Sequence, residues 1–186
     1  MHLFIRHPPL PTMHGRCYGR TDTDLPAAIF SAAANDLHPQ LPPWPMVCSP
    51  LRRCVGLARA VLALDRATPS PHAAGDAAPA ASTRGLRTDA RLVELDFGQW
   101  EDRPWSEIPR TDLDAWAGDV TDYRPPDGES FNDVIARVRD ALQGLATPHI
   151  VITHAGVIRA ALHLLRGDAP ATAAAIAIPY VSVIRP

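Results

Sequence analysis

The chain contains no lysine, and all eighteen of its basic residues are arginines. Any anion that it binds must therefore be held by arginine, by histidine or by backbone amides, and arginine can hold a phosphate or a carboxylate through two parallel hydrogen bonds. The formal net charge is -2 and the pI is near 6.4, whereas general nucleic-acid binders are strongly basic. We therefore expect no nucleic-acid partner.

Cysteine is also scarce. The three cysteines, Cys17, Cys48 and Cys54, leave one unpaired in any disulfide scheme and lack the CxxC spacing of a zinc site. We expect reduced, structural thiols in a cytoplasmic protein. No apolar run approaches the roughly twenty residues that a membrane span needs, and we expect neither a signal peptide nor a membrane partner.

The chain is organised around a short predicted strand close to residue 1 and the basic residues that follow it. Residues 3–5 form a short apolar run of the kind found in buried parallel strands, and Arg6 and His7 follow it. Pro8 and Pro9 cannot donate to a strand ladder, so the strand has to end there. Open α/β sheets bind ligands outside the carboxyl ends of their strands. The pair alone indicates little, because a histidine in this position is more often satisfied by a backbone carbonyl than catalytic.

A second stretch has the same design. Residues 149–154 are typical of a buried strand that ends in His154, and Ala155 and Gly156 then open a helix that Gly167 would cap. His154 would thus lie at a strand end and at a helix N-terminus, where exposed amides favour a phosphate.

The remaining pattern predicts alternating strands and helices. We expect helices over 26–37, from Pro50 after a Ser49 cap, over 105–116 and over 129–145, and strands over 46–48, 91–93 and 179–184. Such alternation indicates an α/β fold, a three-layer α/β/α sandwich around a mainly parallel central sheet. With 186 residues, the chain 1–186 should form a single domain, and residues 66–84 should form a flexible internal loop.

Arginines and a carboxylate accompany the two histidines. Arg52 and Arg53 would lie in the first turn of the helix after Ser49, beside amides that favour an anion. Two cations at such a pocket would keep a neighbouring imidazole neutral by like-charge repulsion. Glu94 precedes a run that contains Phe97, and aromatic surroundings favour the protonated carboxyl group that an acid catalyst needs. The alternative for Glu94 is an ordinary surface turn.

The segment 15–22 is a candidate substrate loop. It contains two glycines, two arginines and a tyrosine, and it could close over a ligand or simply form a solvated connection. Its candidate ligand-contacting residues are Arg16, Arg20 and Thr21.

Taken together, these motifs resemble those of the histidine phosphatase superfamily, which includes phosphoglycerate mutases and alpha-ribazole phosphatases. The matching segments occur in order along nearly the whole chain, at 5–7, 19–22, 48–53, 94–101, 128–130 and 153–159. The resemblance implies a phosphoglycerate mutase-like fold.

The resemblance also implies roles for individual residues. His7 would be the catalytic nucleophile that takes the phosphoryl group, and Glu94 would protonate the leaving oxygen and then activate water. The rest of the phosphate-binding pocket would comprise Arg6, Arg53, His154 and the backbone amide of Ala155. No metal and no other cofactor is implied, and a metal hydrolase built on His7 and His14 is disfavoured because no cysteine or aspartate falls at ligand spacing.

Segments 17–22 and 94–101 look most like the alpha-ribazole phosphatase branch. The implied activity is that of a phosphomonoesterase acting on a small phosphorylated metabolite, for instance alpha-ribazole 5'-phosphate in cobalamin biosynthesis. Two alternatives stay open: a phosphoglycerate mutase, and a catalytically inactive domain that binds phospholigands. The oligomeric state also stays open, a homodimer included.

The chain departs from the family pattern after the nucleophile. The family has a glycine, then a Ser or Thr and an Asn that help to bind phosphate, where this chain has Pro8, Leu10 and Met13. His14, Arg16 or Thr21 would have to replace them.

Overall fold

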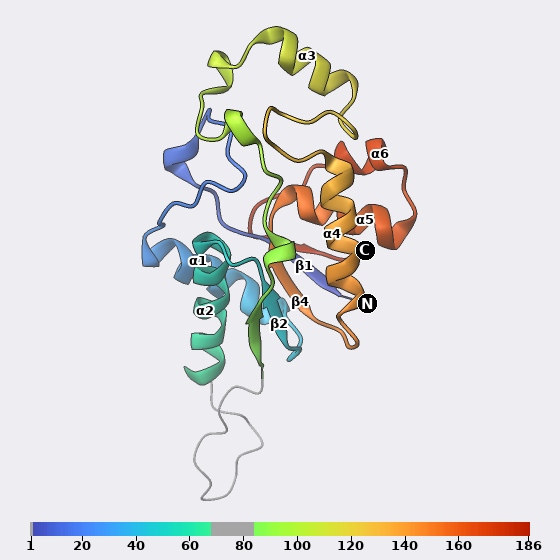
Figure 1. Cartoon of the computed structure of the whole chain (residues 1–186). Helices are drawn as coiled ribbons and strands as arrows, with labels where there is room; N and C mark the ends of the chain where they lie inside the picture. The colour runs from blue at the N-terminus through green and yellow to red at the C-terminus, as the bar shows by residue number, and fades with distance from the viewer. Residues whose placement is uncertain (1, 68–83) are drawn as a thin grey trace, which may run out of the picture.

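The central sheet is built from the apolar runs of the sequence. The computed structural model describes residues 2–67 and 84–186 (Figure 1), and within them the sheet has five strands in the order β3-β2-β4-β1-β5. The strands are β1 (Leu3–Arg6), β2 (Met46–Cys48), β3 (Leu86–Thr88), β4 (Ile150–Thr153) and β5 (Val183–Ile184). Neighbouring strands are parallel, except that β5 runs antiparallel to β1.

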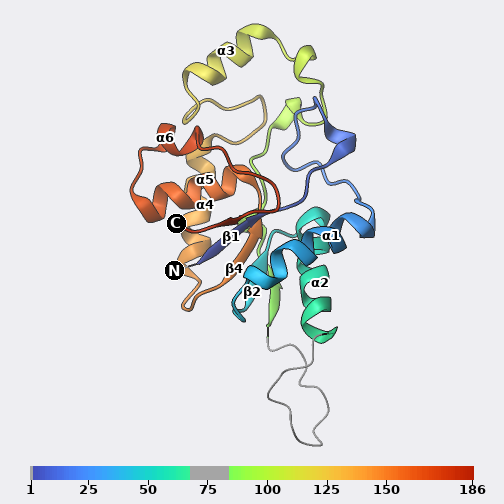
Figure 2. The ribbon, with the colours of Figure 1, turned by 180° about the vertical axis from the view of Figure 1, so that it is seen from behind.

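Helices cover both faces of this sheet. They are α1 (Ala27–Leu37), α2 (Arg52–Ala67), α3 (Arg110–Gly118), α4 (Phe131–Gln143), α5 (Ala155–Arg166) and α6 (Pro170–Ala174). Successive strand residues point to opposite faces, so Phe4 packs in the core cluster that contains α4 and α5 residues, and Ile5 in the cluster that contains α1 and α2 residues. Figures 1 and 2 show these helix pairs on opposite sides of the sheet. The predicted three-layer α/β/α sandwich is confirmed.

Short 3-10 turns connect many of these elements, and they span Pro11–Met13, His38–Gln40, Ala90–Leu92, Gly98–Trp100 and Trp105–Glu107. Beyond the carboxyl edge of the sheet, α3 and its neighbouring loops enclose a third core cluster (Figure 1). Its buried members are Cys17, Trp100 and Ile108. The segment that contains Cys17 is tied to this cluster because the Cys17 amide donates to the carbonyl of Arg103 at 2.8 Å.

Several predicted helices are confirmed at their ends. The Ser130 hydroxyl accepts from the amide of Asp133, whose carboxylate accepts from the Ser130 amide, so the helix predicted over 129–145 begins with a complete capping box. Gly167 ends α5 with a φ of 80°, a conformation that glycine adopts at low cost. The helix predicted from residue 26 begins at Ala27.

Other predicted elements differ from the structure. The strand predicted over 91–93 is instead a 3-10 turn that begins at Ala90, because the Asp89 carboxylate accepts from the Arg91 amide and caps it. The helix predicted over 105–116 is broken before Pro109, since proline restricts the preceding residue to extended geometry. The helix predicted from Pro50 begins at Arg52.

Three further differences concern the last strand, the last helix and the internal loop. The strand predicted over 179–184 is only two residues long, and α6 was not predicted. Most of the loop predicted over 66–84 lies outside the described residues, and its first two residues belong to α2.

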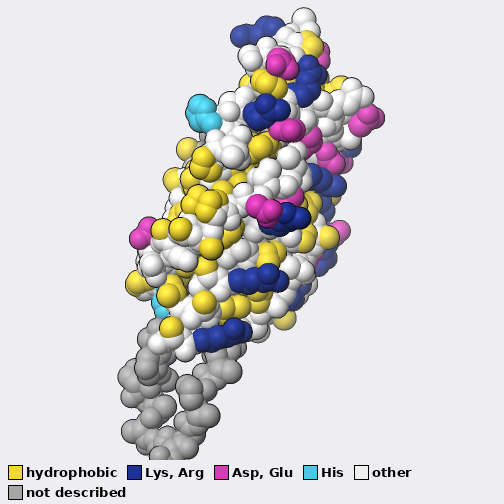
Figure 3. Space-filling view, turned by 90° about the vertical axis from the view of Figure 1, so that its left-hand side faces the viewer, with side chains coloured by type: hydrophobic (Ala, Val, Ile, Leu, Met, Phe, Trp, Pro, Cys, Tyr) yellow, Lys and Arg dark blue, Asp and Glu magenta, His cyan; other side chains and the backbone are white. Residues whose placement is uncertain are grey.

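The described surface carries charges of both signs. On the face shown in Figure 3, arginines lie among hydrophobic and acidic side chains and form no continuous basic area. The three cysteines are buried and unpaired, as expected. None of the described helices combines the length and apolar character that would let it cross a bilayer.

Candidate active site

The register of two central strands brings the two histidines together. Arg6 of β1 pairs with Thr153 of β4, so the next residues along these parallel strands, His7 and His154, are neighbours. The His7 amide extends the ladder by donating to the Thr153 carbonyl at 3.0 Å. The two imidazole centroids lie 5.0 Å apart, and the rings meet edge to face at 61°. Strand pairing therefore joins residues that are far apart in the sequence.

The guanidinium of Arg53 lies between the two rings. Its Nε donates to Nε2 of His7 and to Nδ1 of His154, each at 3.3 Å. Its terminal nitrogens donate to the carbonyls of Thr21 at 2.8 Å and Gly19 at 2.5 Å. Arg53 is fully buried, so its positive charge is fixed between the imidazoles.

These contacts define the tautomers of both rings. Nδ1 of His7 lies 2.6 Å from the carbonyl of Pro8, which can only accept, so Nδ1 carries the proton and Nε2 keeps its lone pair. In His154, Nδ1 accepts from Arg53, and Nε2 lies 2.8 Å from the Ser49 hydroxyl oxygen. Nε2 of His7 is therefore the nitrogen available for nucleophilic attack.

Both imidazoles are held in their neutral form. Burial lowers the pKa of His7 well below its ordinary value of 6.5, and the positive charges of Arg53 and Arg6 lower it further. Burial also lowers the pKa of His154 well below 6.5, with His7 and Arg53 as the next causes. Like-charge repulsion, which the sequence led us to expect, thus acts in the expected direction but is smaller than desolvation. A neutral ring is what a nitrogen nucleophile requires.

Arg6 has an aromatic partner that sequence reasoning missed. Its guanidinium carbon lies 3.6 Å from the ring centroid of Tyr180, and its Nη1 donates to the carbonyl of Ile178 at 2.6 Å. The Tyr180 hydroxyl lies 2.9 Å from that of Tyr18. The Nε of Arg6 is buried and has no hydrogen-bond partner within residues 2–67 and 84–186. A buried donor without an acceptor calls for an explanation, and an anion is the fitting one for a guanidinium.

The backbone beside Tyr180 is strained. Val181 has a φ of 50°, which β-branched residues rarely adopt, and its amide donates to the Arg6 carbonyl at 3.1 Å. The Tyr180 ring also meets the His7 ring edge to face, with centroids 5.7 Å apart. Strain that is maintained beside a site of this kind is a sign of function.

The Glu94 carboxylate contacts the first turn of α5. Its Oε1 accepts from the amide of Leu95 at 3.0 Å, and its Oε2 accepts from the amide of Gly156 at 3.1 Å. A side chain at position 156 would overlap the Glu94 carboxylate. Glycine is therefore needed there for the close approach of the carboxylate to the helix.

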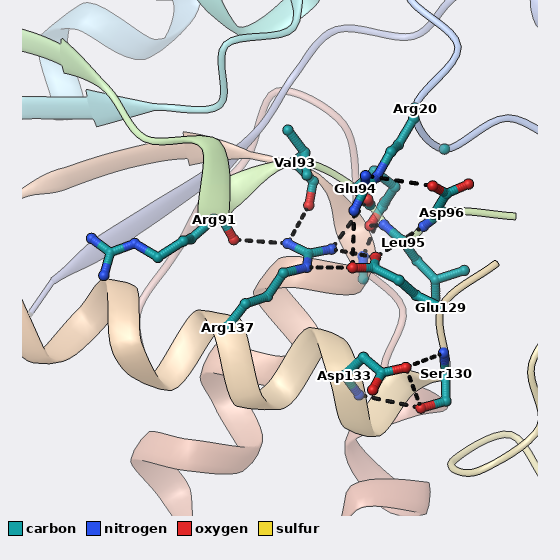
Figure 4. A network of polar contacts seen from close by, with 12 residues as sticks. Arg20, Arg91, Val93, Glu94, Leu95, Asp96, Glu129, Ser130, Asp133 and Arg137 are labelled. Carbon is teal, nitrogen blue, oxygen red and sulfur yellow. Dashed lines mark hydrogen bonds and ion pairs between the residues drawn. The ribbon is translucent and has the colours of Figure 1, made fainter. Parts of the chain in front are cut away.

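Arg137 on α4 fixes the segment that contains Glu94 (Figure 4). Its Nη1 donates to the carbonyls of Arg91 and Val93, each at 2.7 Å, and its Nη2 donates to the carbonyl of Glu94 at 3.1 Å. Glu129 accepts from Nε and Nη2 of the same guanidinium at 3.1 Å and 3.0 Å. Arg137 is thus a positioning residue for Glu94, and Glu129 belongs to a segment that carried the resemblance without an assigned role.

A cavity of about 250 Å³ opens at this edge of the sheet. Six of the predicted site residues line it, and these are Arg6, His7, Arg16, Arg53, Glu94 and Ala155. The rings of Tyr18 and Tyr180 also line it. His154 is fully buried and is not among the lining residues, but it contacts Arg53, which lines the cavity.

Two residues of the predicted substrate loop do not line this cavity. Nη2 of Arg20 donates to Glu129 at 2.9 Å, and Nη1 lies 3.4 Å from Asp96. The hydroxyl of Thr21 donates to Glu101 at 2.5 Å. Both side chains hold the loop in place, because each has its charge or donor satisfied by a carboxylate. Arg16 also pairs with a carboxylate, that of Asp102 at 2.6 Å, but it lines the cavity.

The helix terminus that we predicted as an anion site is already capped. The Arg52 amide at the start of α2 donates to both carboxylate oxygens of Asp22, at 3.0 Å and 3.1 Å. Leu10 and Met13, which replace the polar residues of the family, are buried, and His14 is exposed and does not line the cavity. Of the three proposed substitutes, Arg16 is the one that lines it.

The sequence did not identify several residues of the site, among them Tyr18, Arg137, Arg159 and Tyr180. Tyr18 and Arg159 belonged to the segments that carried the resemblance, so their motifs were a usable signal. Tyr180 and Arg137 gave no such signal. Tyr180 lies just before a two-residue strand, and Arg137 lies on α4, to which the sequence assigned no chemistry.

Comparison with known proteins assigns a family. The profile of the histidine phosphatase superfamily (branch 1) matches residues 3–185. Among curated proteins, the bifunctional protein Rv2228c of Mycobacterium tuberculosis is 36% identical over 84 residues. That match covers 41% of this chain and 23% of the relative, so the chain corresponds to only a part of that longer protein.

Solved structures resemble nearly the whole chain. A phosphoglycerate mutase from Thermus thermophilus has a TM-score of 0.70 at 27% identity, and the match covers 97% of this chain and 89% of that one. The mycobacterial glucosyl-3-phosphoglycerate phosphatase Rv2419c, in complex with VO3, has a TM-score of 0.78 at 25% identity, with 98% and 90% covered.

Proposed function

Because the chain belongs to the histidine phosphatase superfamily (branch 1), we propose that it hydrolyses a phosphomonoester of a small metabolite through a phosphohistidine on His7. The observation that carries this proposal is the orientation of the His7 ring. Its Nδ1 is held by the Pro8 carbonyl, and its Nε2 keeps a lone pair beside Arg53, at a cavity that Glu94 also lines.

In the first step, Nε2 of His7 attacks phosphorus while the bond between phosphorus and the ester oxygen breaks. Protonated Glu94 gives its proton to the leaving oxygen, which departs as an alcohol. In the second step, Glu94 takes a proton from water, and the hydroxyl attacks phosphorus while the phosphorus–nitrogen bond breaks. Phosphate is released and His7 is restored.

Positive charge at the site would stabilise the transferring phosphoryl group. Phosphoryl transfer depends mainly on positioning and on charge stabilisation, and Arg6, Arg16 and Arg53 all line the cavity. A phosphate at Nε2 of His7 would take the place of the Arg53 Nε–H that now contacts it. Binding therefore requires this 3.3 Å hydrogen bond to be exchanged for one to a phosphate oxygen.

Purified protein incubated with p-nitrophenyl phosphate in the presence of a chelator tests the proposal. We expect turnover that is lost in His7→Asn, and a protein-bound phosphoryl group that is stable in alkali and labile in acid, as a phosphoramidate is. Turnover that survives in His7→Asn would refute the phosphohistidine. Loss of turnover on chelation would point to a metal hydrolase instead.

A mutase is the second candidate, because one solved structure with a TM-score of 0.70 is a phosphoglycerate mutase. A mutase keeps the phosphoryl group and returns it to a second hydroxyl. Incubation with 3-phosphoglycerate, with and without a bisphosphoglycerate primer, separates the two activities, because a phosphatase releases inorganic phosphate and makes no 2-phosphoglycerate.

The third candidate is an inactive domain that binds phospholigands, and the apolar Leu10 and Met13 in place of the polar family residues favour it. It predicts phosphate binding by calorimetry without turnover. For an active enzyme, alpha-ribazole 5'-phosphate and phosphorylated sugars belong in the first substrate panel.

A further inference from the structure

A second cavity adjoins the one at His7. Its volume is about 310 Å³, compared with about 250 Å³ for the first. Glu94, Phe97, Trp116 and Arg159 line both, so the two cavities meet at these four side chains. We call the second cavity, lined by residues 94, 95, 97, 116, 120, 131, 156, 159 and 174, the inner chamber.

The polar and apolar groups of the inner chamber are separated. Its charged side chains, Glu94 and Arg159, belong to the boundary that it shares with the cavity at His7. The walls that the cavity at His7 does not share are apolar: Leu95, Val120, Phe131 and Ala174, with the backbone of Gly156. Val120 and Ala174 also line a third cavity. A polyhydroxylated group placed there would leave its hydroxyls without partners, which is costly.

Two aromatic rings, those of Phe97 and Trp116, form part of the boundary. Phe97 and Trp116 meet edge to face at 82°, with centroids 6.0 Å apart, and Trp105 stacks on Trp116 at an angle of 11°. Rings packed against one another in this way have little freedom to turn, so the boundary is preformed. A preformed apolar cavity beside a few polar groups is the usual design of a small-molecule site.

The position of Glu94 sets the direction in which a substrate would lie. An acid that protonates the leaving oxygen has to lie on the side of phosphorus opposite to the nucleophile. Since Glu94 lies on the boundary between the two cavities, the alcohol attached to that oxygen would extend past it into the inner chamber.

We propose that the inner chamber binds the leaving group, and that the substrates are phosphomonoesters whose alcohol carries an aromatic or bulky apolar body. This inference rests on the proposed phosphatase activity. It assigns the substrate class from the shape and chemistry of the chamber walls, which the catalytic residues alone do not define.

Two alkyl esters with similar leaving oxygens test the inference: ethyl phosphate and phenethyl phosphate. Because both release a primary alkanol, the ratio of their kcat/KM values reports binding of the phenyl ring more than leaving-group chemistry. We expect phenethyl phosphate to be preferred by roughly tenfold to a hundredfold, as expected for burying one ring.

Ala174→Phe fills the inner chamber and should abolish most of this preference while changing kcat/KM for ethyl phosphate by less than about threefold. Thr172→Phe is the matched control, since Thr172 lies on the same short helix, is exposed and lines neither the chamber nor the cavity that adjoins it at Val120 and Ala174. Val120→Asp introduces a charge into the same wall and gives a second route to the same loss if the larger side chain prevents folding.

The outcomes separate this inference from the proposed function. Equal kcat/KM values for the two alkyl esters, or a preference that survives both chamber variants, overturn the inference and leave the phosphatase intact. Failure to hydrolyse these esters and p-nitrophenyl phosphate alike overturns the proposed function, and the inference with it.

Discussion

The two buried imidazoles should make the fold sensitive to mild acid. In the folded chain, the pKa values of His7 and His154 both lie well below 6.5, chiefly because the rings are buried. The unfolded chain binds protons at its histidines near pH 6.5, so below that pH it binds more protons than the folded chain. Stability is therefore complete above about pH 6.5 and falls as the pH goes down.

The size of the effect follows from linkage. One unit below the unfolded pKa, each imidazole that stays neutral in the folded state costs RT ln 11, or about 1.4 kcal/mol. For His7 and His154, which are 2% and 0% exposed, the sum is about 3 kcal/mol at pH 5.5. This is a large part of the roughly 5 to 15 kcal/mol that stabilises a typical domain.

Urea unfolding at about pH 7.5 and pH 5.5 in phosphate-free buffer measures this difference. The double variant His7→Asn/His154→Asn is the control, because it has no titrating ring at either position and keeps His2, whose pKa is also lowered by burial. We expect the wild type to lose about 3 kcal/mol more than the variant between these pH values. Equal losses in the two proteins would show that the pair is not neutral and buried, and would remove the basis for a neutral nucleophile.

Three further predictions concern the residues that position the site. Arg137→Met leaves three carbonyls without this donor and removes one of the cationic partners of Glu129, which keeps Arg20. Urea unfolding should therefore show a loss of about 2 to 4 kcal/mol. Arg139→Met, exposed on the same helix, should change stability by less than about 0.5 kcal/mol, and equal losses in the two variants would contradict the positioning role of Arg137. Gly156→Ala displaces the Glu94 carboxylate, so kcat should fall at least about tenfold. Inhibition by inorganic phosphate should be kept. An unchanged kcat would argue against Glu94 as the acid. Tyr180→Ala should raise KM roughly tenfold, and Tyr180→Phe should raise it less than about threefold. Similar KM values for the two variants would assign the effect to the hydroxyl instead of the ring.

Local signals along the chain were sufficient for much of the fold. The apolar runs that became β1, β2 and β4 are short, continuous and bounded by proline or polar residues, and their burial on both faces follows from their composition. The Ser130 cap and the Gly167 terminus were predictable because each satisfies its helix end within a few residues. The strand expected over 91–93 was wrong for two reasons. Asp89 caps a 3-10 turn there, and a distant guanidinium, that of Arg137, binds the carbonyls of Arg91 and Val93.

The sequence by itself determined that His7 and His154 lie at the carboxyl edge of the sheet, because each directly follows a buried strand. Only the tertiary structure decided that Arg53 lies between two rings, that Tyr180 covers Arg6, and that Arg20 and Thr21 turn away to carboxylates. The physical reason is the range of the interactions. Caps, turns and apolar runs are satisfied within a few residues, whereas each of these contacts joins groups far apart in the chain. The position of Arg53 between the two rings also depends on the register of β1 against β4.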